Sequence, residues 1–148
     1  MSEENNTQLN RREQTRYLVE ELLGERAQVW ELYCKIAGVE PYQSNKTDAT
    51  QVQEFCQILV DYISLGHFGI YQRIIDGSER RQSIIKAAAQ IYPQINQATE
   101  AVLSFNEKYQ APTVEMILNQ LPGDLSFLGD QLATRIELED KLIGEMLT

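Results

Sequence analysis

Apolar residues recur at three- and four-residue steps along most of the chain, which is the spacing of amphipathic α-helices. The first such stripe contains Leu18, Leu22, Arg26, Val29, Trp30, Tyr33 and Ala37, and the second contains Val52, Phe55, Cys56, Leu59, Ile63, Gly66, Ile70 and Ile74. The third contains Ile84, Ala88, Ile91, Ile95, Ala98, Val102 and Phe105, and the fourth contains Leu125, Leu128, Leu132, Arg135, Glu139, Leu142 and Met146. No stretch alternates as a strand would. The pattern predicts an all-α fold, an antiparallel four-helix-type bundle with long, kinked helices.

Glycine and proline mark the ends of these stretches. Gly38, followed by Pro41, predicts the end of the first helix, and the turn at 76–78 offers Ser78 as a helix N-cap. Residues 111–113 open a new segment, residues 122–124 predict a break or kink, and Pro93 predicts a bend in the third helix. We expect one domain over residues 1–148, with residues 1–12 as a flexible polar arm.

Charge narrows the choice of partners. The chain carries 13 basic and 22 acidic residues, for a net charge of −9. A phosphate backbone or an anionic membrane would be repelled, so we expect no direct nucleic-acid or membrane binding, and a basic protein is the favoured partner. No apolar run approaches the roughly 18 residues of a membrane span. With a polar N-terminus and two cysteines, the sequence predicts a cytoplasmic protein with reduced thiols.

The sequence offers little for catalysis. Di-metal sites in helical bundles need paired Glu-x-x-His motifs, whereas His67 is the one histidine in the chain. A cysteine nucleophile would have to be Cys34 or Cys56 paired with His67, and Cys56 lies on the second core stripe. No phosphate-binding loop, serine elbow or zinc pattern is present. We therefore expect no enzyme activity, no catalytic residue, no metal and no cofactor.

Two charged residues interrupt the apolar stripe of the last helix. Arg135 and Glu139 are four residues apart, which suits an intrahelical ion pair whose stems pack on the core. The alternative is an internal polar network of Arg135, Glu139 and His67. Such a network would also suit the competing functional interpretation, a helical-bundle sensor that binds a small molecule in an internal pocket.

The stretch 55–75 carries apolar residues on both of its sides. Opposite the Leu59 core face, a 100° helical step places Gln57, Asp61, Ser64, Leu65, Phe68, Gln72 and Ile75. One interpretation is a central helix covered on both sides, with Asp61 hydrogen-bonded in the interior. The other is a partner-binding face, since apolar anchors ringed by polar residues suit an interface.

The same stretch resembles the Rsd/AlgQ family of bacterial anti-sigma factors. The likeness lies in Phe55-Cys56-Gln57, Leu59-Val60-Asp61-Tyr62, Ser64, Gly66-His67-Phe68 and Ile70-Tyr71, in the block from Leu138 to Ile143, and in Tyr92-Pro93-Gln94 through Phe105-Asn106. It covers most of residues 16–147. The chain departs from the family at Leu22, where a tryptophan is common, and Trp30 comes two turns later.

This resemblance implies an all-helical protein that binds the primary sigma factor of RNA polymerase at its C-terminal helix-turn-helix domain. It places sigma contacts at Asp61 and Phe68, and the outer face adds Gln57, Ser64, Leu65 and Gln72 as candidates. We expect a monomer that forms a one-to-one complex and keeps sigma from polymerase by sequestration.

Overall fold

The computed structural model describes residues 2–38, 47–75 and 79–147, and nearly all of them are helical. The chain begins with the long helix α1 (Ser2–Ala37). A continuous helical stretch follows, made of α2 (Ala49–Ser64), η2 (Leu65–Tyr71) and α3 (Gln72–Ile75). Two more long helices, α4 (Gln82–Lys108) and α6 (Leu121–Leu147), come next, with the short α5 (Val114–Asn119) between them. No strand occurs in these three segments. The all-α bundle predicted from the sequence is confirmed.

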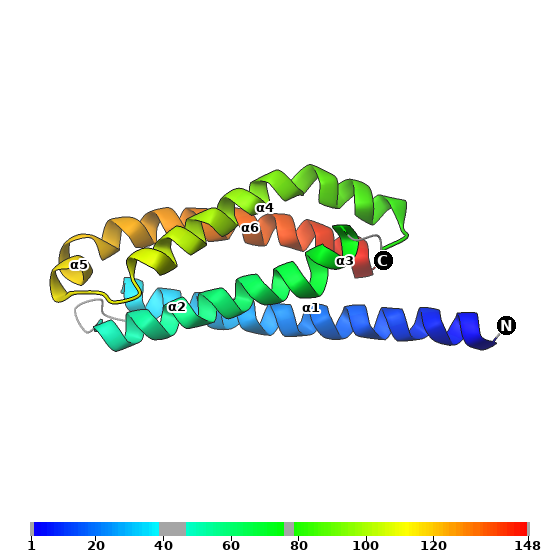
Figure 1. Cartoon of the computed structure of the whole chain (residues 1–148), viewed down its shortest axis with the longest axis horizontal. Helices are drawn as coiled ribbons and strands as arrows, with labels where there is room; N and C mark the ends of the chain where they lie inside the picture. Colours follow the sequence, from blue (N-terminus) through cyan, green and yellow to red (C-terminus); the bar gives the residue numbers. More distant parts are fainter. Residues whose placement is uncertain (1, 39–46, 76–78, 148) are drawn as a thin grey trace.

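The helices form two layers. In Figure 1, α4 lies along α6 in one layer, and α1 lies along the α2–η2 stretch in the other. The N-terminal part of α1 extends beyond its neighbours. Residues 2–12 continue this helix, whereas the sequence predicts a polar arm there; the arm's flexibility stays a prediction. No helix in the described part of the chain is both long and apolar enough to cross a membrane.

Local capping explains several of the helix ends. Gly38 adopts a positive φ of 73°, the left-handed conformation that ends helices, so the predicted stop of α1 is confirmed there. Asp48 and Gln51 form a reciprocal capping box at the start of α2. Thr113 accepts from the Met116 N–H and caps α5. The predicted features at residues 39–41 and 76–78, including the Ser78 cap, lie outside the described residues.

The predicted break at residues 122–124 occurs earlier. α5 ends at Asn119 and α6 begins at Leu121, so Pro122 and Gly123 lie in the first turn of α6. A proline there costs little, because the first amides of a helix have no intrahelical partner. Pro93 stands inside α4, which bows outward in Figure 1.

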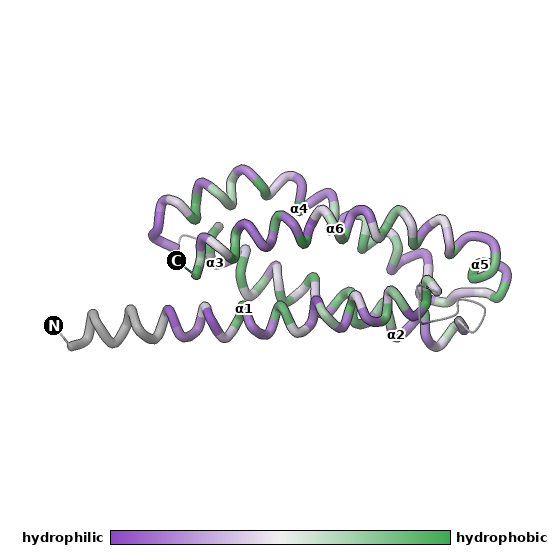
Figure 2. Tube along the Cα trace, turned by 180° about the vertical axis from the view of Figure 1, so that it is seen from behind, coloured by the Kyte–Doolittle hydropathy of each residue, from purple (hydrophilic) through white to green (hydrophobic). Residues whose placement is uncertain are grey.

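The core lies between the two layers. Every residue of the second, third and fourth predicted stripes is buried. Of the first stripe, Leu22 and Val29 are buried and the others are half-buried. Polar and apolar residues alternate along the coloured helices in Figure 2. At one end of the bundle, Phe55 meets Phe105 edge-on at 5.9 Å between ring centroids, which joins the layers.

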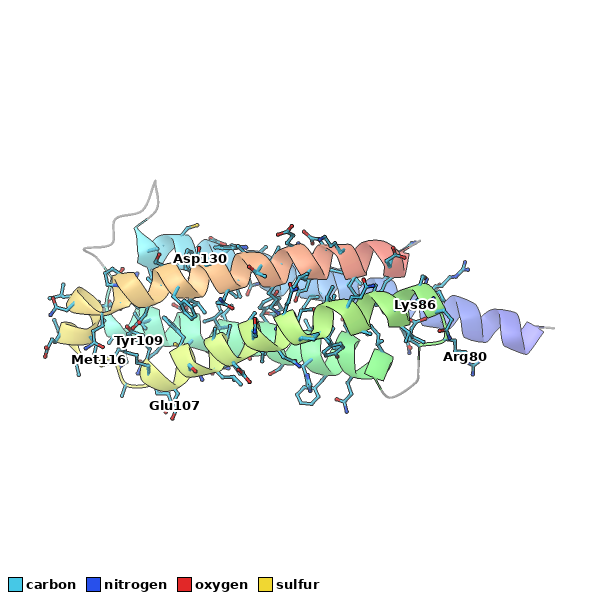
Figure 3. The ribbon with its side chains drawn as sticks, turned by 90° about the horizontal axis from the view of Figure 1, so that it is seen from above. Arg80, Lys86, Glu107, Tyr109, Met116 and Asp130 are labelled. Atoms are coloured by element: carbon cyan, nitrogen blue, oxygen red, sulfur yellow. The ribbon has the colours of Figure 1, made fainter. Side chains whose placement is uncertain are left out.

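A second contact ties α4 to α6 at the end that carries α5, where Figure 3 labels Tyr109 and Met116. The Tyr109 hydroxyl donates to Asp124, and the Lys108 ammonium lies 2.7 Å from the same carboxylate. Although burial raises the pKa of Asp124, the hydrogen bonds from Lys108 and Tyr109 hold it below its ordinary value. The contact with Lys108 and Tyr109 therefore favours the ionised form of the Asp124 carboxylate.

Candidate functional site

The outer face of the α2–η2 stretch is open to solvent. Gln57, Asp61 and Gln72 are exposed, and Phe68 keeps 67% of its surface accessible. Leu59, on the opposite side, is fully buried. The interpretation that this helix is covered on both sides is wrong for Asp61 and Phe68, because both side chains are exposed.

The remaining predicted members of this face are less open. Ser64 and Leu65 are half-buried, and Leu65 packs against the edge of the core. The Gln57 side-chain amide donates to Asp61 Oδ1 across 3.1 Å, one helical turn away. Nothing is described of the Ile75 side chain. The outer face is thus a polar strip around one protruding aromatic ring.

A π-helical segment lies at the centre of this stretch. Leu65–Tyr71 form η2, and the Gln72 N–H donates to the His67 carbonyl five residues earlier. Single-turn π-helical insertions are rare and occur frequently at functional sites. Here Ile70 and Tyr71 point inward while Phe68 points outward. The hydrophobic pattern does not reveal this segment, because a helical wheel with one 100° step assumes an α-helix throughout.

His67 lies on the outside of η2. Its side chain is exposed, and its ring meets the Phe68 ring edge-on at 4.8 Å between centroids. The prediction that His67 joins an internal polar network is therefore wrong. His67 and Phe68 both lie on the solvent side of η2, while Gly66 and Tyr71 face the interior.

Arg135 and Glu139 do form a buried polar network, and each is only 1% exposed. Glu139 Oε1 accepts from the Tyr62 hydroxyl at 2.6 Å, and Glu139 Oε2 accepts from Tyr71 at 3.0 Å and from Arg135 Nε at 3.1 Å. Arg135 Nη1 donates to Thr99 Oγ1 at 2.6 Å. Arg135 and Glu139 therefore form the predicted intrahelical ion pair, and this pair is also part of a polar network that reaches other helices.

The electrostatics of this network favour a charged arginine and neutral tyrosines. Burial, followed by the Glu139 charge, raises the pKa of Tyr62 and of Tyr71 well above the ordinary tyrosine value. Burial acts to lower the pKa of Arg135, but the neighbouring Tyr71 and Glu139 raise it overall. The guanidinium also stacks over the Tyr62 and Tyr71 rings at 5.3 and 5.6 Å. Both carboxylate oxygens of Glu139 accept hydrogen bonds from within the protein, so the network serves to hold the helices together.

Close packing at Gly66 depends on this network. A Cβ at Gly66 would lie 3.0 Å from Arg135 Nη2 and 3.2 Å from Tyr71 Cε2. Both neighbours are held by hydrogen bonds to Glu139, so they have little room to retreat. The absence of a side chain at Gly66 therefore lets η2 approach α6.

Two catalytic arrangements considered from the sequence can be checked against the described residues. These residues include no group of three or more His, Cys, Asp or Glu side chains placed to hold a metal ion. Burial raises the pKa of Cys56 to about 11, which keeps its sulfur as an unreactive thiol at neutral pH. His67 is eleven residues further along the helical stretch, a rise of about 16 Å. A Cys56–His67 nucleophile pair is therefore not formed.

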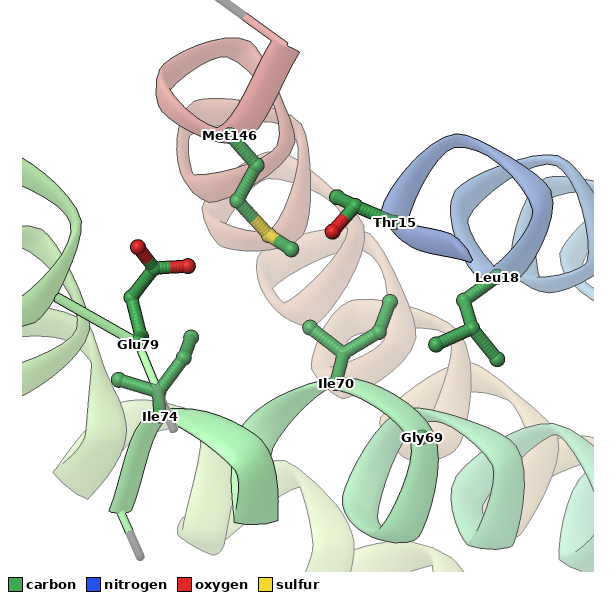
Figure 4. A pocket seen from close by; sticks show the side chains of 7 residues that line it. All are labelled: Thr15, Leu18, Gly69, Ile70, Ile74, Glu79 and Met146. Atoms are coloured by element: carbon green, nitrogen blue, oxygen red, sulfur yellow. The ribbon is translucent and has the colours of Figure 1, made fainter. Parts of the chain in front are cut away.

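A small pocket lies between α1, η2, α3 and the end of α6 (Figure 4). It is lined by Thr15, Leu18, Gly69, Ile70, Ile74, Glu79 and Met146, and its volume is about 20 Å³. That is space for about one water molecule. None of Arg135, Glu139 and His67 lines it, so this pocket is not the one that the small-molecule interpretation requires.

Comparison with known proteins points to a single family. Residues 1–147 match the family model described as "Regulator of RNA polymerase sigma(70) subunit, Rsd/AlgQ". The chain is 33% identical over 130 residues to "Regulator of sigma D" of Yersinia pseudotuberculosis serotype O:1b (strain IP 31758), covering 85% of this chain and 77% of the relative. It is 35% identical over 134 residues to the protein of the same name from Enterobacter sp. (strain 638), covering 86% and 78%.

Proposed function

The chain belongs to the Rsd/AlgQ family of regulators of the RNA polymerase sigma(70) subunit, and from this premise we propose how it acts. It binds the C-terminal, promoter-reading helix-turn-helix domain of the primary sigma factor as a monomer, in a one-to-one complex. Sigma held in this way is withheld from polymerase and the promoter. The protein works in the cytoplasm, contacts no nucleic acid itself and carries out no chemical reaction.

The exposed Phe68 ring is the observation that carries this proposal. A phenylalanine that is 67% exposed on a helix with an otherwise complete core stripe gains nothing for folding. At an interface the same ring provides apolar area that loses its water on binding, which is how a small number of residues come to dominate affinity. Asp61, seven residues earlier, lies two helical turns away on the same face and offers a carboxylate to a basic side chain.

Charge supports the same partner. A domain that reads promoter DNA presents a basic surface to phosphates, and this chain carries a net charge of −9. Opposite charges raise the rate of encounter and disfavour wrong partners. Inhibition by occupation of a surface follows mass action and needs no catalytic group.

The proposal is tested by titration calorimetry of the full chain against the purified C-terminal domain of the sigma subunit. We expect Phe68→Ala to weaken binding by about 2 kcal/mol or more, a factor of roughly 30. Phe127→Ala is the matched control, because Phe127 is 59% exposed but lies on α6 in the other layer. Equal affinities of the two variants would remove Phe68 from the site, and no binding by the unmodified chain would refute the proposed target.

A further inference from the structure

We call the line along which α1 and η2 pack the α1–η2 seam. The residues considered along it are Leu18, Glu21 and Glu25 on α1, and Asp61, Leu65 and Phe68 on the α2–η2 stretch. Its floor is formed at Gly69, where a Cβ would lie 3.5 Å from Leu18 Cδ2 and 3.5 Å from Leu65 Cδ1. Figure 4 shows Leu18 projecting from α1 toward the segment that contains Gly69. Leu18 and Leu65 therefore both border this glycine.

The α1 bank of the seam is acidic. Residues three or four positions apart share a helix face, so Glu21 lies beside Leu18, and Glu25 lies beside both Leu22 and Glu21. Leu22 contacts η2 as well, since a Cβ at Gly66 would lie 3.6 Å from its Cδ1. Glu21 is exposed and Glu25 is half-buried. Both carboxylates consequently border the seam on its solvent side.

The opposite bank carries the proposed sigma contacts. Asp61 and Phe68 are exposed and Leu65 is half-buried, so all three lie away from the Leu59 core face of the α2–η2 stretch. Gly69, the residue after Phe68, faces Leu18 of α1, so Phe68 stands beside the line where η2 packs on α1. The exposed ring therefore borders the seam.

The negative charge of the seam is not neutralised by the described side chains around it. Arg26 is turned to the other side of α1, where its Nη1 lies 2.8 Å from Asp140 and 3.6 Å from Glu139 on α6. Among the described residues, neither Glu21 nor Asp61 forms an ion pair. The seam thus offers carboxylates on both of its helices together with an exposed aromatic ring, a combination that is complementary to a positively charged helix that also carries an apolar residue.

We propose that the α1–η2 seam receives a basic helix of the partner, with Phe68 as its apolar anchor and with the Glu21 and Glu25 carboxylates of α1 selecting for positive charge. The inference rests on the proposed function, because the partner is the sigma domain named there. It adds a second helix to the binding surface. It also assigns specificity to residues outside the α2–η2 stretch.

The test compares two double variants that change the net charge equally. Glu21→Gln with Glu25→Gln alters the seam, and Glu107→Gln with Glu115→Gln alters exposed carboxylates on α4 and α5. Association and dissociation rates with the sigma C-terminal domain are measured by surface plasmon resonance at low and at physiological salt. Circular dichroism confirms that every variant keeps the helical content of the unmodified chain.

We expect the seam variant to associate about tenfold more slowly at low salt and to lose most of the salt dependence, while the control stays within about twofold of the unmodified chain. If the two double variants have equal effects, the seam inference is overturned. If Phe68→Ala still weakens binding in that case, the proposed function stands without the seam. Failure of the unmodified chain to bind would instead overturn the proposed function, and the seam inference with it.

Discussion

Tyr71 of η2 donates a 3.0 Å hydrogen bond to Glu139 Oε2 of α6, across 68 positions of sequence. The same segment exposes Phe68 on its other side, so one short helix carries both a buried anchor and the exposed ring. Phe68 and Tyr71, three residues apart in this π-helical segment, thus face opposite environments. The consequences can be tested by substitutions on either side of η2.

Gly66→Ala should destabilise the fold. Alanine usually stabilises a helix relative to glycine, by roughly 0.5–1 kcal/mol. At Gly66 the new methyl group would lie 3.0 Å from Arg135 Nη2, which is held by its bonds to Glu139 and Thr99. We expect a net loss of about 1–2 kcal/mol in the free energy of unfolding, measured by urea denaturation.

The control for this variant is Gly24→Ala in α1, where a Cβ would have nothing within 4 Å. It should raise the free energy of unfolding by the ordinary helical amount. If both alanines stabilise the protein, the contact between η2 and the Arg135 guanidinium is looser than the structure shows.

Glu139→Ala should be among the most damaging single changes. It leaves the Arg135 guanidinium, 1% exposed, without its carboxylate, and it removes the acceptor of two tyrosine hydroxyls. Breaking a buried pair by removing one partner costs about 3–5 kcal/mol. Chemical denaturation should show this loss, whereas Glu137→Ala, an exposed neighbour on the same helix, should stay within about 0.5 kcal/mol of the unmodified chain.

Two tyrosines in contact with the network should respond in opposite ways to loss of the hydroxyl. Tyr62 donates to Glu139 at 2.6 Å, so Tyr62→Phe should cost about 1.5–3 kcal/mol. The Tyr92 hydroxyl is buried and has no hydrogen-bond partner among the described residues, so Tyr92→Phe should be neutral or stabilising. Thermal unfolding of the two variants gives the comparison, and an equal loss from both would contradict it.

The helices themselves could be predicted from the sequence, because burial of an amphipathic face leaves a 3.6-residue period in the order of residues. Every residue placed on the Leu59 face is buried, and Asp61 and Phe68 are exposed as expected. Helix ends depended on local chemistry and were predicted less well: Gly38 ends α1, but the break expected at Pro122 lies at Gln120.

The internal network could be predicted only in part. Arg135 and Glu139 drew attention as charged residues on an apolar stripe, yet their partners Tyr62, Tyr71 and Thr99 lie on other helices, and tyrosine suits a core stripe as well as a network. His67 was assigned to the network but lies outside it, beside Phe68 on the exposed side of η2. Inter-helix pairing and helix type arise from tertiary packing, which a single helical wheel does not contain. The nearest sequence signal for the network was Gly66, which lies between Tyr62 and Tyr71.

Asp124 should contribute to the loss of folding stability at acidic pH. Its pKa is held below the ordinary value by Lys108 and Tyr109, so the folded state favours the ionised form. This contribution is fully present above the unfolded pKa of about 4 and is lost as the pH falls through the lower, folded value. Melting temperatures should show Asp124→Asn less stable than the unmodified chain near neutral pH, with the difference shrinking below about pH 4. A constant difference across that range would remove Asp124 from the acid response.

The last prediction separates binding from folding on the two sides of one helix. Phe68 is 67% exposed and Leu59 is fully buried, nine residues earlier. Leu59→Ala should cost about 2–5 kcal/mol of stability, because it removes transfer energy and leaves a cavity in a closely packed core. Phe68→Ala should change the free energy of unfolding by less than about 0.5 kcal/mol, since its ring has few partners to lose. Denaturation and sigma-domain titration are run on both proteins. We expect Leu59→Ala to unfold early while its folded fraction binds normally, and Phe68→Ala to fold normally while binding weakly. If Phe68→Ala unfolds as early as Leu59→Ala and its folded fraction binds normally, the outer face of α2–η2 serves the fold and the sigma site lies elsewhere.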